Sequence, residues 1–437
     1  MGDPICAPST PLLPSALAVV RISGEALGPR LSGWFPLPPP RRATLCALSW
    51  GGFRERVLVL HFPAPRSYTG EDVVELQVPG NPLLVRRLLD HLGSLGIRLA
   101  EPGEFTRRAL LNGKQDLLQA EALRDLIQAA TEAQVLQAEA AAGGLPAWLR
   151  EARETLGPWV AAAEAAVDYG EEEGLSLDPG DLGGFLAGLE QTFHVEQQRA
   201  EAARWLRDGI IVVLAGRPNA GKSTLFNTLL GRDRSIVTPQ PGTTRDSLDA
   251  QVEWRGLPLL LHDTAGLRDT EDPIEREGVR RIRPLLEGCD LILHLVPAGD
   301  AAEDPFVRDL LAPFKGRSQV IRTFGDLAPG PGPWEGEPRI CAPSGDLDGL
   351  EGVLRSRFLG PLSPEACRGA LGTPRQRELL TELLRQVRDL RSLDPGAPAE
   401  LMASGLQGLW TLLTRLSGED RAESTLDQVF GGFCLGK

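Results

Sequence analysis

Residues 210–230, IIVVLAGRPNAGKSTLFNTLL, decide the fold of the part of the chain around them. The continuous apolar run IIVVLA is typical of a strand buried on both faces, and the residues from Lys222 onward are typical of a helix. Between them, residues 216–223 match GxxxxGK[ST], whose glycines let backbone N–H groups surround phosphate oxygens at the positive end of a helix. We therefore predict a nucleotide-binding P-loop, with Lys222 on the β- and γ-phosphates and the Ser223 hydroxyl on Mg²⁺.

Two more motifs follow the P-loop in the order found in GTPases. The sequence GTTRD occupies 242–246, where Thr244 is placed to complete the Mg²⁺ shell, and DTAG occupies 263–266. Because Asp263 ends the apolar run LPLLLH, its carboxylate can hold Mg²⁺ through water, and the Gly266 N–H can contact the γ-phosphate. Three motifs in this order predict a GTPase rather than a kinase or an ATPase.

The motif expected to read the base departs from the usual pattern. Many GTPases carry Asn-Lys-x-Asp after the next strand, whereas this chain has TFGD at 323–326. Asp326 can accept hydrogen bonds from guanine N1–H and the 2-amino group. Thr323 cannot reproduce an amide, and Phe324 replaces the lysine whose stem covers the base. We therefore expect guanine to be selected with weakened affinity. Cys341-Ala342 stands where Ser-Ala is usual.

The 437 residues are enough for roughly three domains. Residues 1–115 alternate short apolar runs with Pro/Gly turns, which predicts an α+β domain. Residues 116–207 and 358–437 have helical spacing and predict one all-α domain. Residues 208–357 alternate strands and helices, which predicts a Ras-like α/β domain inserted between the two helical segments.

Local patterns add detail to this division. In the first 115 residues, we predict strands at 16–22, 57–61 and 73–78, and a helix over 82–92 with Gly93 just past its end. Within the helical part, the acidic stretch EEEGLSLDPGDLGG at 171–184 predicts a solvated loop.

Charge and cysteine content limit the classes of partner. The net charge is −13, so RNA contact is expected to be local, on a basic patch such as Arg107, Arg108 and Lys114. The six cysteines form no CxxC pair, which argues against a zinc site or a disulfide framework. No apolar run approaches 18 residues and no secretory signal begins the chain, so a cytoplasmic protein without a membrane anchor is expected.

Taken together, these motifs resemble the MnmE (TrmE) family of tRNA wobble-uridine modification GTPases. The resemblance extends along essentially the whole chain. It includes ALAVVRISG at 16–24, SYTGEDVVEL at 67–76, EPGEFTRRALLNGKQDLLQAEALRDLI at 101–127, DTAGLRDTEDPIEREG at 263–278 and FCLGK at 433–437.

This resemblance implies that the N-terminal domain binds tetrahydrofolate, as the 5,10-methylene or 5-formyl form, and forms a homodimer. The family's folate contacts fall on Arg21, Glu75, Lys114 and Lys437. Without the resemblance, each of these would be interpreted as an ordinary strand or surface charge. The chemistry is consistent, because carboxylates bind a pterin's N–H edge and cations suit the glutamate tail of a folate.

The resemblance also completes the nucleotide site. Leu267 stands where many GTPases have a water-orienting glutamine, and the family's water-orienting glutamate falls on Glu275. A K⁺ ion beside the phosphates takes the place of an arginine finger, with ligands at Asn219, Thr238, Gln240 and Thr243. The full expected GTP-binding set is Asn219, Ala220, Gly221, Lys222, Ser223, Thr224, Thr238, Gln240, Gly242, Thr243, Thr244, Asp263, Thr264, Ala265, Gly266, Asp326, Cys341 and Ala342.

The reaction implied is addition of an aminomethyl-type group to C5 of the tRNA wobble uridine, using a folate one-carbon unit. Cys434 has a role in that step, and the flavoprotein MnmG is the partner. Two segments depart from the family pattern around the folate site: STPLLPSA at 9–16 replaces a Gly-rich stretch, and VPGN at 78–81 replaces His-Gly-Gly. Two alternatives stay open. One is a regulatory switch GTPase, for example in ribosome assembly, without one-carbon chemistry. The other is a family member that no longer selects guanine.

Overall fold

The computed structural model describes residues 3–173, 179–232, 248–264, 282–327, 336–394, 397–419, 423–433 and 436. The chain forms two compact units, one comprising Met1–Arg124 with Thr414–Lys437 and the other comprising Asp125–Leu413. The predicted three-domain division, with boundaries after 115, 207 and 357, stays a prediction. Among the described helices, none combines the length and hydropathy needed to cross a bilayer.

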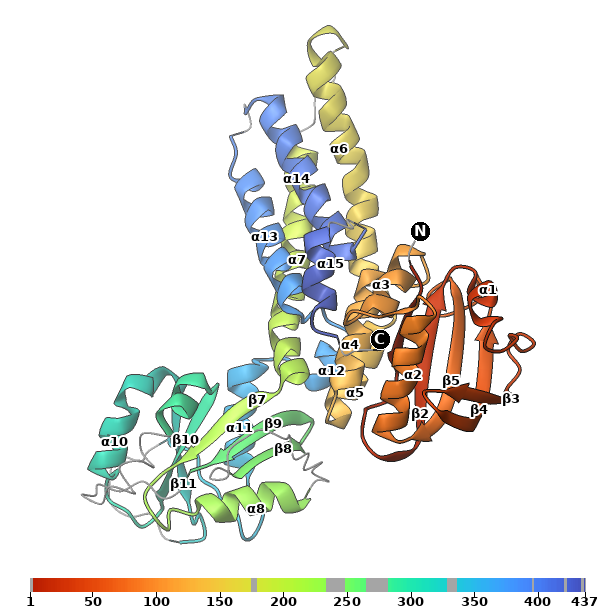
Figure 1. The fold of residues 1–437 in the computed structure, drawn as a ribbon. Coiled ribbons are helices and arrows are strands. Elements are labelled where there is room, and N and C mark those ends of the chain that lie inside the picture. The colour runs from red at the N-terminus through yellow and green to blue at the C-terminus, as the bar shows by residue number, and fades with distance from the viewer. Residues whose placement is uncertain are drawn as a thin grey trace. The chain divides into compact units, whose positions relative to one another are not determined.

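The first unit contains a six-stranded sheet in the order β3-β4-β5-β2-β1-β6 (Figure 1). Its strands are antiparallel except for the parallel pair β1 and β6. The bounds are β1 Ile5–Pro8, β2 Ser15–Gly24, β3 Thr44–Trp50, β4 Phe53–Phe62, β5 Asp72–Gly80 and β6 Arg98–Leu99. The predicted strands at 16–22, 57–61 and 73–78 lie within β2, β4 and β5.

Helices α1 (Leu27–Leu31) and α2 (Pro82–Ser94) cover one face of this sheet. The core between them contains inward-facing strand residues such as Val20, Val57 and Leu76 together with Leu88 of α2. Because strand side chains alternate between faces, this single set of apolar positions fixes the register of the sheet.

The start of α2 follows the prediction, but its end does not. Asn81 caps the helix, since its side chain accepts from the backbone N–H groups of Leu83 and Leu84. The helix continues through Gly93 to Ser94. The left-handed position after the helix is taken by Gly96, whose φ is +75°, so the expected stop at Gly93 was wrong.

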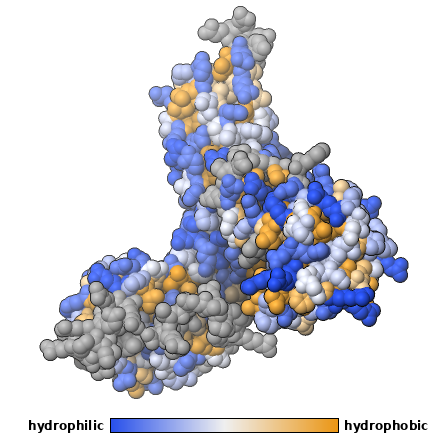
Figure 2. Space-filling model, in the orientation of Figure 1, coloured by the Kyte–Doolittle hydropathy of each residue, from blue (hydrophilic) through white to orange (hydrophobic). Residues whose placement is uncertain are grey.

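The other face of the sheet is covered at its β1 end by α3 (Glu104–Leu111). The buried cluster there contains Ile5, Ala7, Ala100 and Phe105, with Tyr68 packed against it. Next to α3, the start of α4 (Leu117–Gln128) and α15 (Glu423–Phe430) share an apolar cluster. On the face of this unit seen in Figure 2, apolar side chains lie scattered among hydrophilic ones.

The second unit contains a five-stranded sheet in the order β11-β10-β7-β9-β8. All neighbours are parallel except β8 and β9. The bounds are β7 Ile210–Ala215, β8 Leu248–Trp254, β9 Leu257–Asp263, β10 Leu291–Pro297 and β11 Ser318–Thr323, with the helices α8 Lys222–Arg232, α10 Pro305–Leu311, η1 Ala312–Arg317 and α11 Asp348–Phe358.

Both faces of this sheet are buried. Leu293 of β10 lies in one hydrophobic cluster and its neighbour Ile292 in the other, which explains why these strands are continuous apolar runs. The predicted α/β architecture is therefore confirmed for this part of the chain.

The other described helices of the second unit range in length from 4 to 30 residues (Figure 1). They are α5 Glu132–Ala141, α6 Ala147–Glu173, α7 Pro179–Asp208, α12 Pro364–Cys367, α13 Pro374–Arg391 and α14 Ala399–Ser417. Thr131 and Thr373 each begin a helix with a reciprocal capping box, to Gln134 and Gln376.

The predicted loop at 171–184 was partly wrong. Residues 171–173 end α6, and residues 179–184 form the first turns of α7. Pro179 suits the first turn of a helix, and Leu182 is buried. Burial of Leu182 therefore outweighs the poor helix propensity of the glycines in this segment.

Candidate active site

The P-loop connects the end of β7 to the start of α8, which begins at Lys222. Gly216 has φ of +154°, Asn219 +62° and Gly221 +92°. A Cβ on Gly216 would lie 2.7 Å from the backbone oxygen of Leu295, so glycine is required there. A glycine-containing turn directly before the positive end of α8 is the backbone arrangement that an anion site uses.

Lys222 lies in the mouth of this loop and is 6% exposed. Its Nζ donates to the backbone oxygens of Gly216 and Arg217, both at 3.0 Å. Burial lowers the pKa of Lys222, while the nearby Asp263 carboxylate opposes that shift. The ammonium is therefore held at the loop by groups that a phosphate oxygen can replace.

Ser223 and Asp263 come together as the sequence predicts. The Ser223 Oγ donates to Asp263 Oδ2 at 3.2 Å. The Oδ1 atom of Asp263 is buried and has no hydrogen-bond partner among the described residues, and burial raises the pKa of this carboxyl. An unpartnered buried carboxylate oxygen beside a hydroxyl is the donor set that suits Mg²⁺. Next to it, Thr264 ties the end of β9 to β7 through a bond to Leu214 O at 2.6 Å.

The base-recognition segment follows β11 and lies against the P-loop. The Thr323 hydroxyl donates to Ala220 O at 2.8 Å. The Cys341 thiol lies 3.5 Å from Asp326 Oδ1 as a donor, and the adjacent Ala342 is buried, with its carbonyl accepting from Thr228 at 3.3 Å. The two ends of the predicted guanine site are therefore adjacent. The contact of Thr323 was missed at the sequence level, because it joins residues about 100 positions apart.

A second contact that sequence reasoning missed is an ion pair between the P-loop and the loop after β10. Arg217 donates through Nε and Nη2 to the two carboxylate oxygens of Asp300, at 2.9 and 2.8 Å. Nothing in the motif distinguishes Arg217 from a variable position, so no sequence signal could have identified this pair.

Several predicted residues lie outside the described part of the chain. In the G domain they are Thr238, Gln240, Gly242, Thr243, Thr244, Ala265, Gly266 and Glu275. At the C-terminus they are Cys434 and Lys437. Their predicted roles stay predictions. The described neighbour Gly436 lies against the end of β1, where Ser9 Oγ donates to Gly436 O at 3.4 Å.

Three predicted folate residues lie on or beside the first sheet. Arg21 of β2 is the register partner of Glu75 of β5, and both its Nε and its Nη2 donate to Glu75 Oε1, at 3.0 and 2.9 Å. The Arg21 guanidinium also lies 5.3 Å from the centre of the Tyr68 ring. Lys114 is exposed, and its Nζ donates to Pro65 O at 3.0 Å. One loop therefore contacts both cations: Tyr68 lies beside Arg21, and Pro65 accepts from Lys114.

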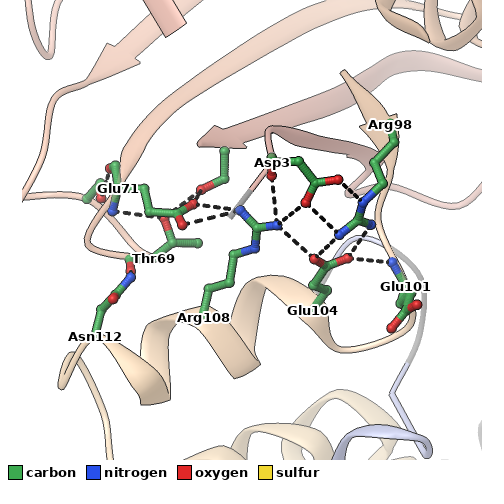
Figure 3. Close-up of polar contacts among 10 residues, drawn as sticks. Asp3, Thr69, Glu71, Arg98, Glu101, Glu104, Arg108 and Asn112 are labelled. Atoms are coloured by element: carbon green, nitrogen blue, oxygen red, sulfur yellow. Dashed lines mark hydrogen bonds and ion pairs between the residues drawn. The ribbon is translucent and has the colours of Figure 1, made fainter. Parts of the chain in front are cut away.

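An ion network fixes the end of that loop on α3 (Figure 3). Arg108 contacts Glu71 at 3.1 Å and Glu104 at 2.8 Å, while Arg98 contacts Asp3 and Glu104, both at 2.6 Å. Burial alone would raise the pKa of Glu104, but hydrogen bonds from Arg98, the Glu101 N–H and Arg108 lower it to about 2.

This network corrects the predicted RNA patch. Arg108 is 8% exposed and committed to carboxylates, and Arg107 pairs with Asp427 at 3.4 Å. Of the three residues expected to contact RNA, Lys114 alone is exposed. Glu71 and Asp427, which pair with these arginines, belong to segments distant from α3 in the sequence, so composition could not reveal the pairing.

Two protein-family models match the chain. Residues 4–114 match the model described as GTP-binding protein TrmE N-terminus, and residues 211–321 match the model described as 50S ribosome-binding GTPase. The first range contains the whole first sheet, and the second contains all of the P-loop sheet except the first residue of β7 and the last two of β11.

Curated relatives match over nearly the whole length. The chain is 40% identical to tRNA modification GTPase MnmE of Rhodopseudomonas palustris, covering 99% of this chain and 98% of the relative. It is 41% identical to the protein of the same name from Phenylobacterium zucineum over the full length of both. It is also 39% identical to the human mitochondrial 5-taurinomethyluridine-[tRNA] synthase subunit GTPB3, covering 96% of this chain and 90% of the relative. The chain therefore belongs to the MnmE (TrmE) family of tRNA modification GTPases and is a GTP-hydrolysing enzyme.

Proposed function

We propose that this GTPase acts with the flavoprotein MnmG to add an aminomethyl-type group to C5 of the tRNA wobble uridine. The observation that carries the proposal is the similarity, along both lengths, to relatives named as tRNA modification GTPases and to a human relative named as a uridine-modifying synthase subunit. The one-carbon unit comes from 5,10-methylene- or 5-formyl-tetrahydrofolate, and Cys434 takes part in its transfer. The proposed site of this reaction is the cytoplasm.

The proposed folate site is built around Arg21 and Glu75. Their side chains are 18% and 20% exposed, so a ligand can reach them although they form an ion pair. The Tyr68 ring beside Arg21 offers an apolar wall for a flat pterin. In the proposal, Glu75 accepts hydrogen bonds from the pterin edge, and the cations of Arg21, Lys114 and Lys437 bind the glutamate tail.

The proposed K⁺ site lies at the P-loop. Asn219 lies in this loop with a left-handed φ of +62°, a conformation that asparagine adopts more readily than most residues, and its side-chain oxygen is the first ligand in the proposal. The remaining ligands in the proposal are Thr238, Gln240 and Thr243. K⁺ would offset the negative charge that develops on the phosphates, and Glu275 would orient the attacking water.

The proposed homodimer uses the N-terminal sheet. On the face opposite α1 and α2, the β3 residue Leu45 is 51% exposed and the β2 residue Leu17 is 48% exposed. Leu45 is the register partner of Leu58 on β4, so apolar side chains adjoin across two strands. Exposed leucines on the open face of a sheet favour burial by a second copy of the chain.

One reconstitution tests the chemistry. Purified protein is incubated in KCl with MnmG, a reductant for its flavin, GTP, unmodified tRNA, either folate and an ammonium salt as the source of the amino nitrogen. The digested tRNA is then analysed by mass spectrometry for C5-modified uridine. We expect product with the wild type and none with Cys434→Ser. If GTP is hydrolysed while neither tRNA modification nor folate binding occurs, the regulatory switch GTPase becomes the better interpretation.

A rate comparison tests the cation. GTP hydrolysis is measured in KCl and in NaCl at equal ionic strength, with ATP as the control nucleotide. Stimulation by K⁺ that is confined to GTP supports the K⁺ ligands and guanine selection by Asp326. Equal slow rates in the two salts would contradict the K⁺ proposal.

A further inference from the structure

The end of β11 is bonded to the back of the P-loop. Thr323, the last residue of that strand, is 4% exposed. Its hydroxyl donates a 2.8 Å hydrogen bond to the backbone oxygen of Ala220. A Cβ placed on Gly221 would lie 3.5 Å from the Cβ of Thr323, so this side chain packs directly behind the Ala220–Gly221 peptide. Since Thr323 begins the segment that ends at Asp326, the bond joins the base-reading segment to the phosphate-binding loop.

This bond fixes the direction of one peptide plane. In a planar trans peptide, the carbonyl and the following N–H point in opposite directions. With the Ala220 carbonyl held toward Thr323, the Gly221 N–H points away from β11, to the side of the P-loop where the motif binds phosphates. Gly221 has φ of +92° and lacks a Cβ, so its own backbone restrains this plane little. The orientation of the plane therefore depends on Thr323.

A second connection links the same two segments at the start of the P-loop. Arg322 is 2% exposed and donates through its guanidinium to the backbone oxygen of Asp300, at 3.2 Å from Nη2. The carboxylate of Asp300 in turn accepts both hydrogen bonds from Arg217 of the P-loop. Adjacent residues at the end of β11 thus hold the P-loop near both of its ends, directly at Ala220 and through Asp300 at Arg217.

We propose that Thr323 is a positioning residue for the nucleotide phosphates: its hydroxyl orients the Ala220–Gly221 peptide so that the Gly221 N–H faces the phosphate oxygens. The ligand class is a nucleoside diphosphate or triphosphate. The threonine found where an amide is usual is thus a functional tether in this chain. The inference concerns the nucleotide site of the GTPase and does not rest on the proposed tRNA chemistry.

A purely structural role for Thr323 is the alternative. A buried strand threonine can simply satisfy a nearby carbonyl, and its loss would then lower stability without a specific effect on the nucleotide. The two roles differ in three measurable ways: whether the affinity for nucleotides falls at unchanged stability, whether serine rescues it, and whether discrimination between bases is retained.

The test compares Thr323→Val with Thr323→Ser in the full chain. Valine keeps the shape of threonine and removes the hydroxyl, whereas serine keeps the hydroxyl. For each variant, equilibrium affinities for GDP, GTP and inosine diphosphate are measured, together with the melting temperature without nucleotide. Inosine diphosphate lacks the 2-amino group that Asp326 reads, so the GDP-to-inosine-diphosphate affinity ratio reports on the base site alone. Asp326→Ala is the control that should reduce this ratio.

We expect Thr323→Val to weaken GDP and GTP binding about tenfold, which corresponds to ~1.4 kcal/mol, with the same loss for inosine diphosphate and so an unchanged ratio. Thr323→Ser should stay within about threefold of the wild type, since it keeps the hydrogen bond. The melting temperature without nucleotide should be the same for Thr323→Ser and the wild type. If Thr323→Val does not fold, Thr323→Ala removes the same hydroxyl and is judged by the same criteria.

Three results would overturn the proposal. The first is wild-type affinity in Thr323→Val. The second is an equal loss in Thr323→Ser, which would mean that the methyl packing matters rather than the hydroxyl. The third is a collapsed GDP-to-inosine-diphosphate ratio, which would mean that Thr323 shapes the base site instead of the phosphate loop.

Discussion

Replacing Glu104 by glutamine should destabilise the first unit in a way that depends on pH. Glu104 is 9% exposed and lies between two arginines, with Arg98 at 2.6 Å and Arg108 at 2.8 Å. Burial opposes its ionisation, but the hydrogen bonds from Arg98, the Glu101 N–H and Arg108 lower its pKa from an ordinary value of 4.5 to about 2. The ionised carboxylate is thus bound more tightly in the folded state than in the unfolded one.

The magnitude follows from that difference in pKa. A depressed pKa adds stability that is complete above the unfolded value and is lost as the pH falls through the folded value. Lowering the pKa from 4.5 to about 2 corresponds to roughly 3 kcal/mol at pH 7, of which ~1.4 kcal/mol is left at pH 3. We therefore expect the free-energy gap between wild type and Glu104→Gln to shrink by about half between these two pH values.

The assay must report on the first unit, because a chain with two units does not unfold in one step. Pulse-labelling hydrogen exchange in a urea titration, read by mass spectrometry on peptides from β1 and α3, gives that local free energy. Glu101→Gln is the matched control. It removes the same charge from an exposed neighbouring side chain and should change the stability by less than about 0.5 kcal/mol. A Glu104→Gln variant as stable as the wild type at pH 7, or a gap that widens as the pH falls, would refute the reasoning.

Three substitutions test the nucleotide site. Ser223→Ala should raise the MgCl₂ concentration needed for GTP binding about tenfold, because it removes the hydroxyl that we predict to bind the metal; a magnesium titration that overlays the wild type would count against that role. Asp263→Asn should slow hydrolysis roughly a hundredfold, since the metal supplies several kcal/mol of charge stabilisation, while GDP measured without Mg²⁺ should bind nearly as before. Glu275→Ala should abolish most phosphate release and leave binding of a fluorescent GTP analogue intact; loss of binding would contradict its assignment as the water-orienting residue.

The phosphate-binding part of the site could be predicted because it is local. The residues from Gly216 to Ser223 are contiguous, and their conformation follows from glycine, a strand end and a helix start. Asp263 could also be predicted, because the ends of parallel strands meet at one edge of a sheet, and β7 and β9 are neighbours. Residue order and spacing therefore carry the information for this half of the site.

What could not be predicted depends on contacts between distant residues. Arg108 belongs to a basic stretch that is typical of an RNA-binding patch, but its side chain is buried between Glu71 and Glu104. The spacing of residues along α3 cannot reveal that another segment places Glu71 beside it. The end of α2 shows the same limit on a smaller scale. Gly93 and Gly96 are both plausible stops, and the local hydrogen bonds of the following turn select the second.

The TFGD segment departs from the usual motif, but its contacts are consistent with the motif's expected function. The sequence indicates only that an amide and a lysine are absent, which led to an expectation of weaker guanine binding. The contacts divide the task differently: Thr323 supplies a bond to the P-loop, and the Cys341 thiol donates to Asp326. Because a thiol is a weak donor and the contact is 3.5 Å long, the Asp326 carboxylate keeps most of its capacity to accept from guanine N1–H and the 2-amino group. Adenine presents no such pair of donors at that position, so we expect Asp326 to preserve the choice of guanine even though the residues beside it have changed.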